Sequence, residues 1–375
     1  MIINLKSPTD MSAFYIIWEG STLLEEEHER GLSHLMEHLI GKNLDDLQDE
    51  MEVDGIEHNL WTSNNEICAY IIGLDEKIEK WKYKMVDLLC DFSNITKEDF
   101  EKERNIVLSE YYNSFGDQVS SHWLNLDRKL FNKYNPIGCR KALENLKFMN
   151  CLNFFEKQYM YPSKIINVSK NSDFLNDDII FKSYESDSKL KYLTDESHNP
   201  LFEFTNDFNR EASLIMLSPI IEEDNAVINF INTLLSKGLN SPLYKEVREK
   251  RGLVYYISAS QTRYNKSGIT SISTLTKKEN INEVIEAVKY VFENIGQFLT
   301  EERFNIIKES YINNFKINEL ERYNYVTRWI NPDSFSVYEI IDTITFDEVM
   351  EVFNKYYNLD EWYISIDLEE FKENK

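Results

Sequence analysis

Two histidines and a glutamate near the N-terminus have the spacing of a metal site. They are His34, Glu37 and His38, in the run Gly-Leu-Ser-His-Leu-Met-Glu-His-Leu-Ile of residues 31–40. The apolar residues of this run recur at helical spacing and predict a helix with one apolar stripe, which consists of Leu32, Leu35, Met36, Leu39 and Ile40. Histidines four apart on a helix lie about 5–6 Å apart at Cβ, so both can bind one ion. Glu37 can contact a metal-bound water without binding the metal itself.

The alternative is that these three residues only decorate a solvated helix face. The chain has six histidines, so two of them four apart around a glutamate are rare by chance. The order His-x-x-Glu-His is also a known catalytic signature, that of the inverzincins. Both observations favour a metal site.

A helix predicted over residues 96–112 carries two glutamates on its apolar face. Phe100 and Val107 mark that face by helical period, and Glu103 and Glu110 lie on it. Buried carboxylates are costly unless they are paired or bind metal. Each can meet a Lys or Arg in a structural ion pair. With two histidines nearby, a carboxylate would instead complete the three protein ligands that are typical of a catalytic zinc.

Other elements must position these residues. Periodicity and turn residues predict the first-half elements in this order: strand 11–20, helix 31–40, helix 44–53, strands 56–63 and 66–74, helices 77–92, 96–112, 121–133 and 144–159, and strand 164–170. They predict the second-half elements as strand 212–219, helices 224–237 and 241–252, and a strand from residue 254.

Length and composition predict two folded domains in the cytoplasm. A chain of 375 residues exceeds one ordinary core, and 42% hydrophobic residues can fill two. We find neither a signal peptide nor a run of about 18 apolar residues, so no membrane span is expected. The cysteines lack paired spacing and are interpreted as reduced thiols, namely Cys68, Cys90, Cys139 and Cys151.

The charge of the chain bears on its partners. The formal net charge is −24, which argues against nucleic acid as a partner. Such a charge favours solubility, and it would also suit an acidic chamber that takes basic peptides. The sequence has no phosphate-binding loop or dinucleotide fingerprint, so we expect no nucleotide dependence.

The second half repeats short patterns of the first. Residues 299–304 repeat the pattern of 95–100, and residues 353–357 resemble 155–159. The repeat is therefore about one domain long, which favours duplicated domains.

We expect the first domain at residues 1–185, a linker at 186–200 and the second domain at 201–375. The second copy lacks a His-x-x-Glu-His motif, so we expect one metal ion per chain. The four histidines outside the motif are interpreted as solvated or locally hydrogen-bonded, namely His28, His58, His122 and His198.

Four stretches make the chain similar to the pitrilysin/insulinase/mitochondrial processing peptidase family of zinc peptidases. They are residues 31–38, residues 103–110, residues 243–255 and the Asn59-x-x-Thr62 strand. The resemblance covers nearly the whole chain. It implies an α+β fold of two duplicated α/β domains, each a mostly antiparallel sheet covered by helices, that together form half of a clamshell.

The resemblance also implies roles for the first-half residues. His34, His38 and Glu110 would bind one Zn²⁺ per chain. Glu37 would be the general base that activates a zinc-bound water. Glu103 would be a carboxylate behind the metal ligands.

Further roles concern the substrate. Arg248 and Tyr255 match a pair that family members project from a second-half domain to hold the substrate, and they would meet the developing oxyanion or peptide carbonyls. The alternative interpretation of Arg248 is purely structural, because a basic residue near the C-terminus of a helix interacts favourably with the helix dipole. An extended peptide would add to the edge of a strand, with contacts from Asn59, Leu60, Trp61 and Thr62.

The implied function is a zinc-dependent endopeptidase that hydrolyses short unfolded peptides, such as leader or precursor peptides, inside a closed chamber. Family members close that chamber from two halves, so the chain would form a homodimer or a heterodimer with a homologous subunit. Two alternatives are the catalytic half of an obligate heterodimer and a non-catalytic peptide-binding or scaffold subunit. All four expected metal-site residues are present, which disfavours the second alternative.

The chain departs from the family at two points. The strand that usually precedes residues 11–20 is short or missing. Only Gly238-Leu239-Asn240 stands where relatives can carry a glycine run.

Overall fold

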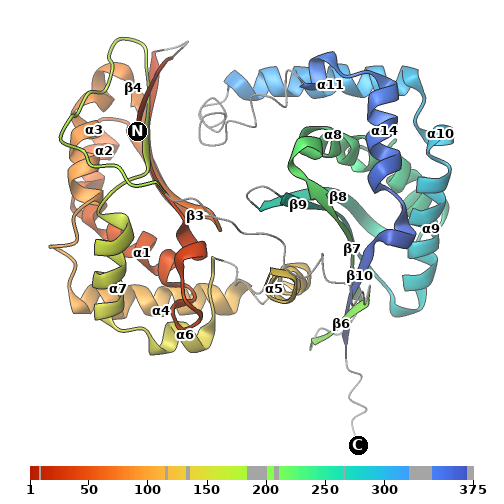
Figure 1. The fold of residues 1–375 in the computed structure, drawn as a ribbon, viewed down its shortest axis with the longest axis horizontal. Helices are drawn as coiled ribbons and strands as arrows, with labels where there is room; N and C mark the ends of the chain where they lie inside the picture. The colour runs from red at the N-terminus through yellow and green to blue at the C-terminus, as the bar shows by residue number, and fades with distance from the viewer. Residues whose placement is uncertain are drawn as a thin grey trace, which may run out of the picture. The chain divides into compact units, whose positions relative to one another are not determined.

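The computed structural model describes residues 1–7, 10–114, 117–131, 136–183, 201–206, 211–264, 267–320 and 340–369. They form two five-stranded sheets with helices packed against them, which is an α+β fold (Figure 1). The chain divides into two compact units. The first unit contains the described residues up to 114 and those of 136–183, and the second contains residues 117–131 and the described residues from 201 onward.

The first unit holds one sheet in the order β1-β5-β2-β4-β3. Its strands are β1 (Ile2–Lys6), β2 (Met11–Glu19), β3 (Glu57–Thr62), β4 (Glu66–Leu74) and β5 (Lys164–Ser169). Its helices are α1 (Leu32–Gly41), α2 (Gln48–Val53), α3 (Asp75–Leu89), α4 (Lys97–Ser114), α6 (Arg140–Asn145) and α7 (Phe148–Phe154). Only β1 and β5 pair in parallel, and β3 is an edge of the sheet.

The second unit repeats this topology with the order β6-β10-β7-β9-β8. Its strands are β6 (Leu201–Asn206), β7 (Ala212–Ile221), β8 (Val254–Tyr264), β9 (Ser267–Thr276) and β10 (Tyr363–Glu369). Its helices are α5 (Gln118–Phe131), α8 (Asn225–Ser236), α9 (Ile281–Glu293), α10 (Ile295–Phe298), α11 (Glu301–Leu320) and α14 (Phe346–Tyr356). Here too the first and last strands pair in parallel, so the expected duplication is confirmed at the level of the fold.

The strand before residues 11–20 is present as β1 and is short, with five residues, as one of the two expected possibilities. Two other details differ from the sequence-based expectations. A single helix was predicted at 144–159. Instead, α6 ends just before Leu146, whose backbone is extended (ψ 143°), and α7 then begins and is followed by a π-helical turn at Phe155–Tyr159. The helix predicted at 44–53 starts as a 3₁₀ turn, Lys42–Leu47, and only then becomes α2.

Helix α5 lies between two segments of the first unit in sequence but packs on the sheet of the second unit. Leu126 and Leu130 of α5 contact Ile215 and Leu217 of β7 in one buried cluster. Burial of this apolar surface favours the arrangement.

The same helix buries His122. Its Nδ1 lies 2.8 Å from Ser213 Oγ and its Nε2 2.7 Å from Ser365 Oγ. Burial lowers the pKa of His122 to about 3, so the ring is neutral at pH 7. The expectation of a solvated or locally bonded histidine was therefore wrong, since both partners are distant in sequence. His28 is exposed near Glu26, and His58 lies 3.0 Å from Gln48 Nε2; His198 lies outside the described residues.

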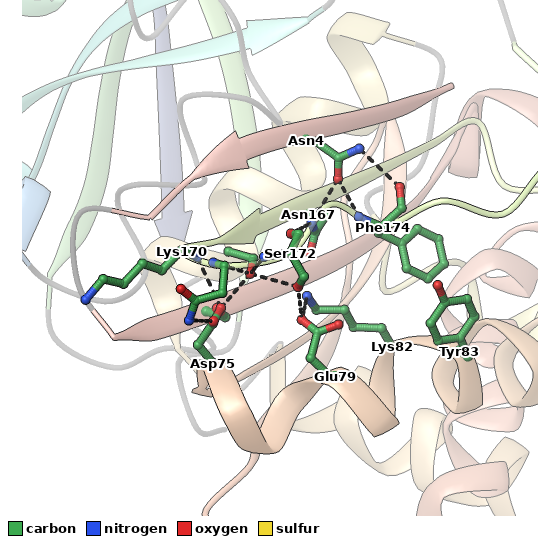
Figure 2. Close-up of polar contacts among 12 residues, drawn as sticks. Asn4, Asp75, Glu79, Lys82, Tyr83, Asn167, Lys170, Ser172 and Phe174 are labelled. Carbon is green, nitrogen blue, oxygen red and sulfur yellow. Dashed lines mark hydrogen bonds and ion pairs between the residues drawn. The ribbon is translucent and has the colours of Figure 1, made fainter.

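A polar network holds the chain that leaves β5 against the first unit (Figure 2). Asn4 of β1 forms hydrogen bonds with both the N–H and the carbonyl of Phe174, at 2.8 and 3.1 Å. At the start of α3, the buried Asp75 carboxylate accepts hydrogen bonds from Ser12, Ser169, Lys170 N and Asn171. Burial raises the pKa of Asp75, but these donors outweigh it and lower the pKa to about 2.

We expect Asp75→Ala to lower the free energy of unfolding by about 3 kcal/mol at pH 7, because several donors lose their acceptor. The folded-state pKa of Asp75 is below its ordinary 3.8, so the carboxylate stabilises the fold above pH 4. About 2 kcal/mol of that stability is lost as the pH falls from 4 to 2. Urea unfolding of the wild-type protein and of Asp75→Ala should therefore show that the difference between their free energies of unfolding decreases as the pH falls from 4 to 2. The exposed Asp10, paired with Lys170, is the control, and Asp10→Ala should change little.

No helix within the described residues is long and apolar enough to span a membrane.

Candidate metal centre

Helix α1, which carries the His-x-x-Glu-His motif, is held in place by its buried apolar face and by a cap at its start. The five apolar residues of its predicted stripe are completely buried in the first core. Ahead of the helix, the buried Glu25 carboxylate accepts the backbone N–H of Gly31 at 3.1 Å and of Ser33 at 2.7 Å. These groups have no partner inside the helix, so the carboxylate caps it. Burial raises the pKa of Glu25 to about 7, although both backbone bonds oppose the rise.

A close approach of two glycines sets where α1 begins. Gly31 and Gly138 both have positive φ, at 101° and 84°. A Cβ on Gly138 would lie 2.4 Å from Gly31 Cα and 2.8 Å from Arg30 O. The loop that leads into α6 therefore touches the backbone where α1 starts, and Cys139 N also donates to Arg30 O at 3.2 Å.

We expect Gly138→Ala to lower the free energy of unfolding by about 3 kcal/mol, from backbone strain and the clash together. Gly55→Ala is the matched control, because Gly55 has a φ of 65° but nothing within 4 Å of its added Cβ. Gly55→Ala should lower the free energy of unfolding only by the contribution of backbone strain, about 1 kcal/mol. Thermal unfolding of both variants compares them, and equal losses would contradict the proposed contact.

The structure brings His34, His38 and Glu110 together. His34 Nε2 lies 3.4 Å and His38 Nε2 3.8 Å from the same carboxylate oxygen, Oε2 of Glu110 on α4. All three ligand atoms lie within 4.8 Å of one another. Ligands bound tetrahedrally to zinc at about 2.05 Å are about 3.3 Å apart, so two of the three separations are close to those of a shared ion.

The protonation state of His34 also fits a metal site. Burial, and then the neighbouring His38, lower the pKa of His34 to about 4, so this ring is neutral at pH 7. His38 Nδ1 lies 3.2 Å from the buried Glu103 carboxylate. Donation of Nδ1–H to that carboxylate would direct the lone pair of Nε2 toward Glu110. Neutral nitrogen and carboxylate oxygen donors without a thiolate suit zinc.

Glu37 and the edge strand meet beside this cluster. The hydroxyl of Thr62, the last residue of β3, donates to Glu37 Oε2 at 2.6 Å. Burial raises the pKa of Glu37, the Thr62 bond and His38 lower it, and Glu110 raises it. The Glu110 side chain is 43% exposed, against 15% for His34 and 18% for His38, so the cluster reaches solvent on the side of Glu110.

The other residues predicted to bind substrate lie in two places. Leu60 packs on the helix-facing core and Trp61 on the opposite face, while Asn59 is exposed. In the second unit, the Arg248 guanidinium lies 5.2 Å from the ring of Tyr255, which is 80% exposed. Asn59 and Tyr255 are therefore exposed, whereas Leu60, Trp61 and Arg248 are half-buried, and the roles of all five stay predictions.

Sequence reasoning missed two contributors to the site and one neighbour of Arg248. Glu25 and Gly138 act on α1 from separate segments, and no local pattern marks them. Tyr244, whose ring lies 4.4 Å from the Arg248 guanidinium, sits one turn before Arg248 on the π-helical segment Tyr244–Lys250, and this spacing was a usable signal.

Comparison with known proteins finds a family model and several relatives that are similar to this chain. The family model described as "Peptidase M16 inactive domain" matches residues 171–311, a range without the motif of α1. An uncharacterized zinc protease of Rickettsia felis is 22% identical over 93% of this chain and 90% of its own length. Further relatives are also called zinc proteases. These matches support a similarity of the chain to the pitrilysin family, the M16 peptidases.

Solved structures share the fold. A protease from Helicobacter pylori has a TM-score of 0.79 at 13% identity, over 98% of this chain and 96% of its own. A chain of Complex III2 from Candida albicans has a TM-score of 0.76 at 12% identity, over 98% of this chain and 92% of its own. These likenesses concern the fold.

Proposed function

We propose that this chain is a zinc-dependent endopeptidase that cleaves short unfolded peptides, such as leader or precursor peptides. The observation that carries the proposal is the cluster itself. Three ligand atoms converge on one point, and Glu37 lies next to them, hydrogen-bonded to an edge strand. Relatives of this chain are called zinc proteases, which supports the proposed peptidase function.

His34, His38 and Glu110 would hold the ion, and Glu103 would orient His38. A zinc ion held there would supply a Lewis acid for the attacking water and the scissile carbonyl. Glu37 takes the proton of the attacking water and delivers it to the leaving amine nitrogen. Its raised pKa suits a group that must both accept and release a proton near neutral pH.

Peptide binding would use β3. An edge strand presents unpaired N–H and C=O groups, and an extended peptide can satisfy them by adding as a further strand. Such a peptide must be unfolded over several residues. Asn59, Leu60, Trp61 and Thr62 would be its neighbours, and their side chains alternate between the two faces of the sheet.

We also propose that Arg248 and Tyr255 bind the substrate, with the Tyr255 hydroxyl donating to the developing oxyanion. Tyr255→Phe keeps the ring beside Arg248 and removes only the hydroxyl, so kcat should fall about 10²-fold with zinc content unchanged. Steady-state kinetics on one peptide measures this. An unchanged kcat would remove the hydroxyl from the mechanism.

The scaffold alternative is kept because the fold neighbour in Complex III2 belongs to an assembly. Dimerisation with a second copy, or with a homologous subunit, is likewise proposed. A cytoplasmic location is proposed too, and all four cysteines are free, which is consistent with a reducing compartment.

Metal analysis, peptide digestion and sizing of the purified chain test the function together. We expect about one zinc per chain, cleavage of unfolded peptides, loss of cleavage with a chelator and its return with zinc. A folded protein substrate should stay intact. Zinc without any cleavage would favour the scaffold or a missing partner, and no bound metal after supplementation would overturn the proposal.

A further inference from the structure

We propose that Thr62 is a positioning residue that holds the carboxylate of Glu37 for proton transfer, so that the strand that receives the peptide also aims the base. This inference rests on the proposed function. Its observation is the 2.6 Å hydrogen bond from Thr62 Oγ1 to Glu37 Oε2. The bond joins β3 to α1, two elements that the chain connects through residues 42–56.

The bond is selective for one carboxylate oxygen. Thr62 occupies Oε2, and within the described residues Glu37 Oε1 has no hydrogen-bond partner. Without the hydroxyl, the end of the Glu37 side chain would be free to rotate about its last torsion, which is broad and two-fold. A carboxylate that is already held in one orientation does not have to be aligned again for proton transfer at each turnover.

Thr62 is itself held in place by the turn that follows it. Ser21 Oγ donates to Ser63 O at 2.7 Å, Thr22 Oγ1 donates to Asn64 O at 3.1 Å, and Gly20 N donates to Asn65 O at 2.6 Å. These bonds tie the β3–β4 turn to the segment that leads toward α1. A hydroxyl on a flexible strand end could not position a carboxylate. The backbone that carries the Thr62 hydroxyl is instead anchored by these three hydrogen bonds.

A link from the same segment reaches the helix. The Arg30 guanidinium donates to Thr22 O at 3.2 Å, and the following residue, Gly31, is capped by Glu25. The turn after Thr62 and the start of α1 therefore share one set of supports. These shared supports would hold β3 and α1 at the positions that the Thr62–Glu37 hydrogen bond requires.

The docking role of β3 gives the bond a second consequence. A peptide that adds to the edge of β3 would pair with the strand that ends in Thr62, so peptide binding and base alignment would involve the same residue. Loss of the hydroxyl should therefore lower kcat and leave KM within about twofold, because the backbone of β3 is intact.

Two substitutions at position 62 and one control test the inference. Thr62→Val keeps the shape and removes the hydroxyl, and Thr62→Ser keeps the hydroxyl. We expect Thr62→Val to lower kcat about 10- to 100-fold and Thr62→Ser to restore most of it. The control is Ser93→Ala, which removes another 2.6 Å hydroxyl–carboxylate bond, to Asp91, on the exposed surface. It should leave kcat unchanged.

A readout without metal or turnover separates positioning from general damage. In the metal-free protein, Thr62→Val should lower the Tm, and in the Glu37→Ala background the same change should lower it less. This non-additivity reports the hydrogen bond itself. Zinc content of Thr62→Val should stay near one per chain, since the metal ligands are elsewhere.

Each outcome decides the matter. A wild-type chain that cleaves while Thr62→Val cleaves equally fast overturns the inference and leaves the proposed function standing. Additive Tm changes, or a loss in Thr62→Val that appears in KM alone, also overturn it. A wild-type chain that binds zinc and cleaves no peptide overturns the proposed function, and the inference with it. A fall in kcat with rescue by serine and non-additive Tm changes supports it.

Discussion

Glu37→Gln should lower kcat for peptide cleavage by about 10²- to 10⁴-fold, the range of general acid–base catalysis, with zinc still bound at about one per chain. Glutamine keeps the size of the side chain and still offers an oxygen to the Thr62 hydroxyl. It cannot accept the proton of the attacking water. Because His34, His38 and Glu110 are unchanged, the metal should stay in place.

This pair of readouts separates a base from a ligand. A glutamate that binds the metal would lose zinc and activity together on substitution, whereas a base loses activity alone. Glu27→Gln is the control, because Glu27 is an exposed carboxylate in the segment just before α1. Full activity in Glu37→Gln would show that another group takes the proton.

Glu110→Gln should weaken zinc binding more than Glu103→Gln does, although both residues lie on α4. Glu110 Oε2 is 3.4 Å and 3.8 Å from the two imidazole Nε2 atoms, which is the place of a ligand. Glu103 Oε2 is 3.2 Å from Nδ1 of His38, on the far side of that ring. Loss of such a supporting carboxylate lowers metal affinity by about 10- to 100-fold.

Competition with a chelator of known affinity measures both constants. Glu101→Gln is the control on the same helix, since Glu101 pairs with Arg104 at the surface and should leave zinc affinity unchanged. Equal losses in Glu103→Gln and Glu110→Gln would mean that the two carboxylates share one role. A larger loss in Glu103→Gln would exchange their assignments.

Much of the architecture could be predicted from local patterns. The apolar stripe of α1 is buried as its spacing predicts, and β2, β4 and β5 lie within one or two residues of their expected bounds, because period and turn residues depend on the nearby chain alone. The weak repeat in the second half predicted the duplication that the two strand orders confirm. Local patterns failed at irregular helix ends, where a 3₁₀ turn precedes α2 and a π turn follows α7.

The sequence by itself also determined which chemistry is available. His34, Glu37 and His38 share one helix face because 3.6 residues per turn place positions i, i+3 and i+4 together. That argument needs no tertiary contact. It predicts the donors, and the donor types predict the class of metal.

Only the tertiary structure decided which carboxylate faces the histidines and what holds the Glu37 carboxylate. Glu103 and Glu110 are two turns apart on α4, so helical period alone gives them equal claims. The packing of α4 against α1 brings Glu110 to the Nε2 atoms and Glu103 to Nδ1 of His38. The Thr62 bond, the Glu25 cap and the contact of Gly138 with Gly31 join segments distant in sequence. Such contacts depend on how buried surfaces fit together, and no spacing along the chain encodes that fit.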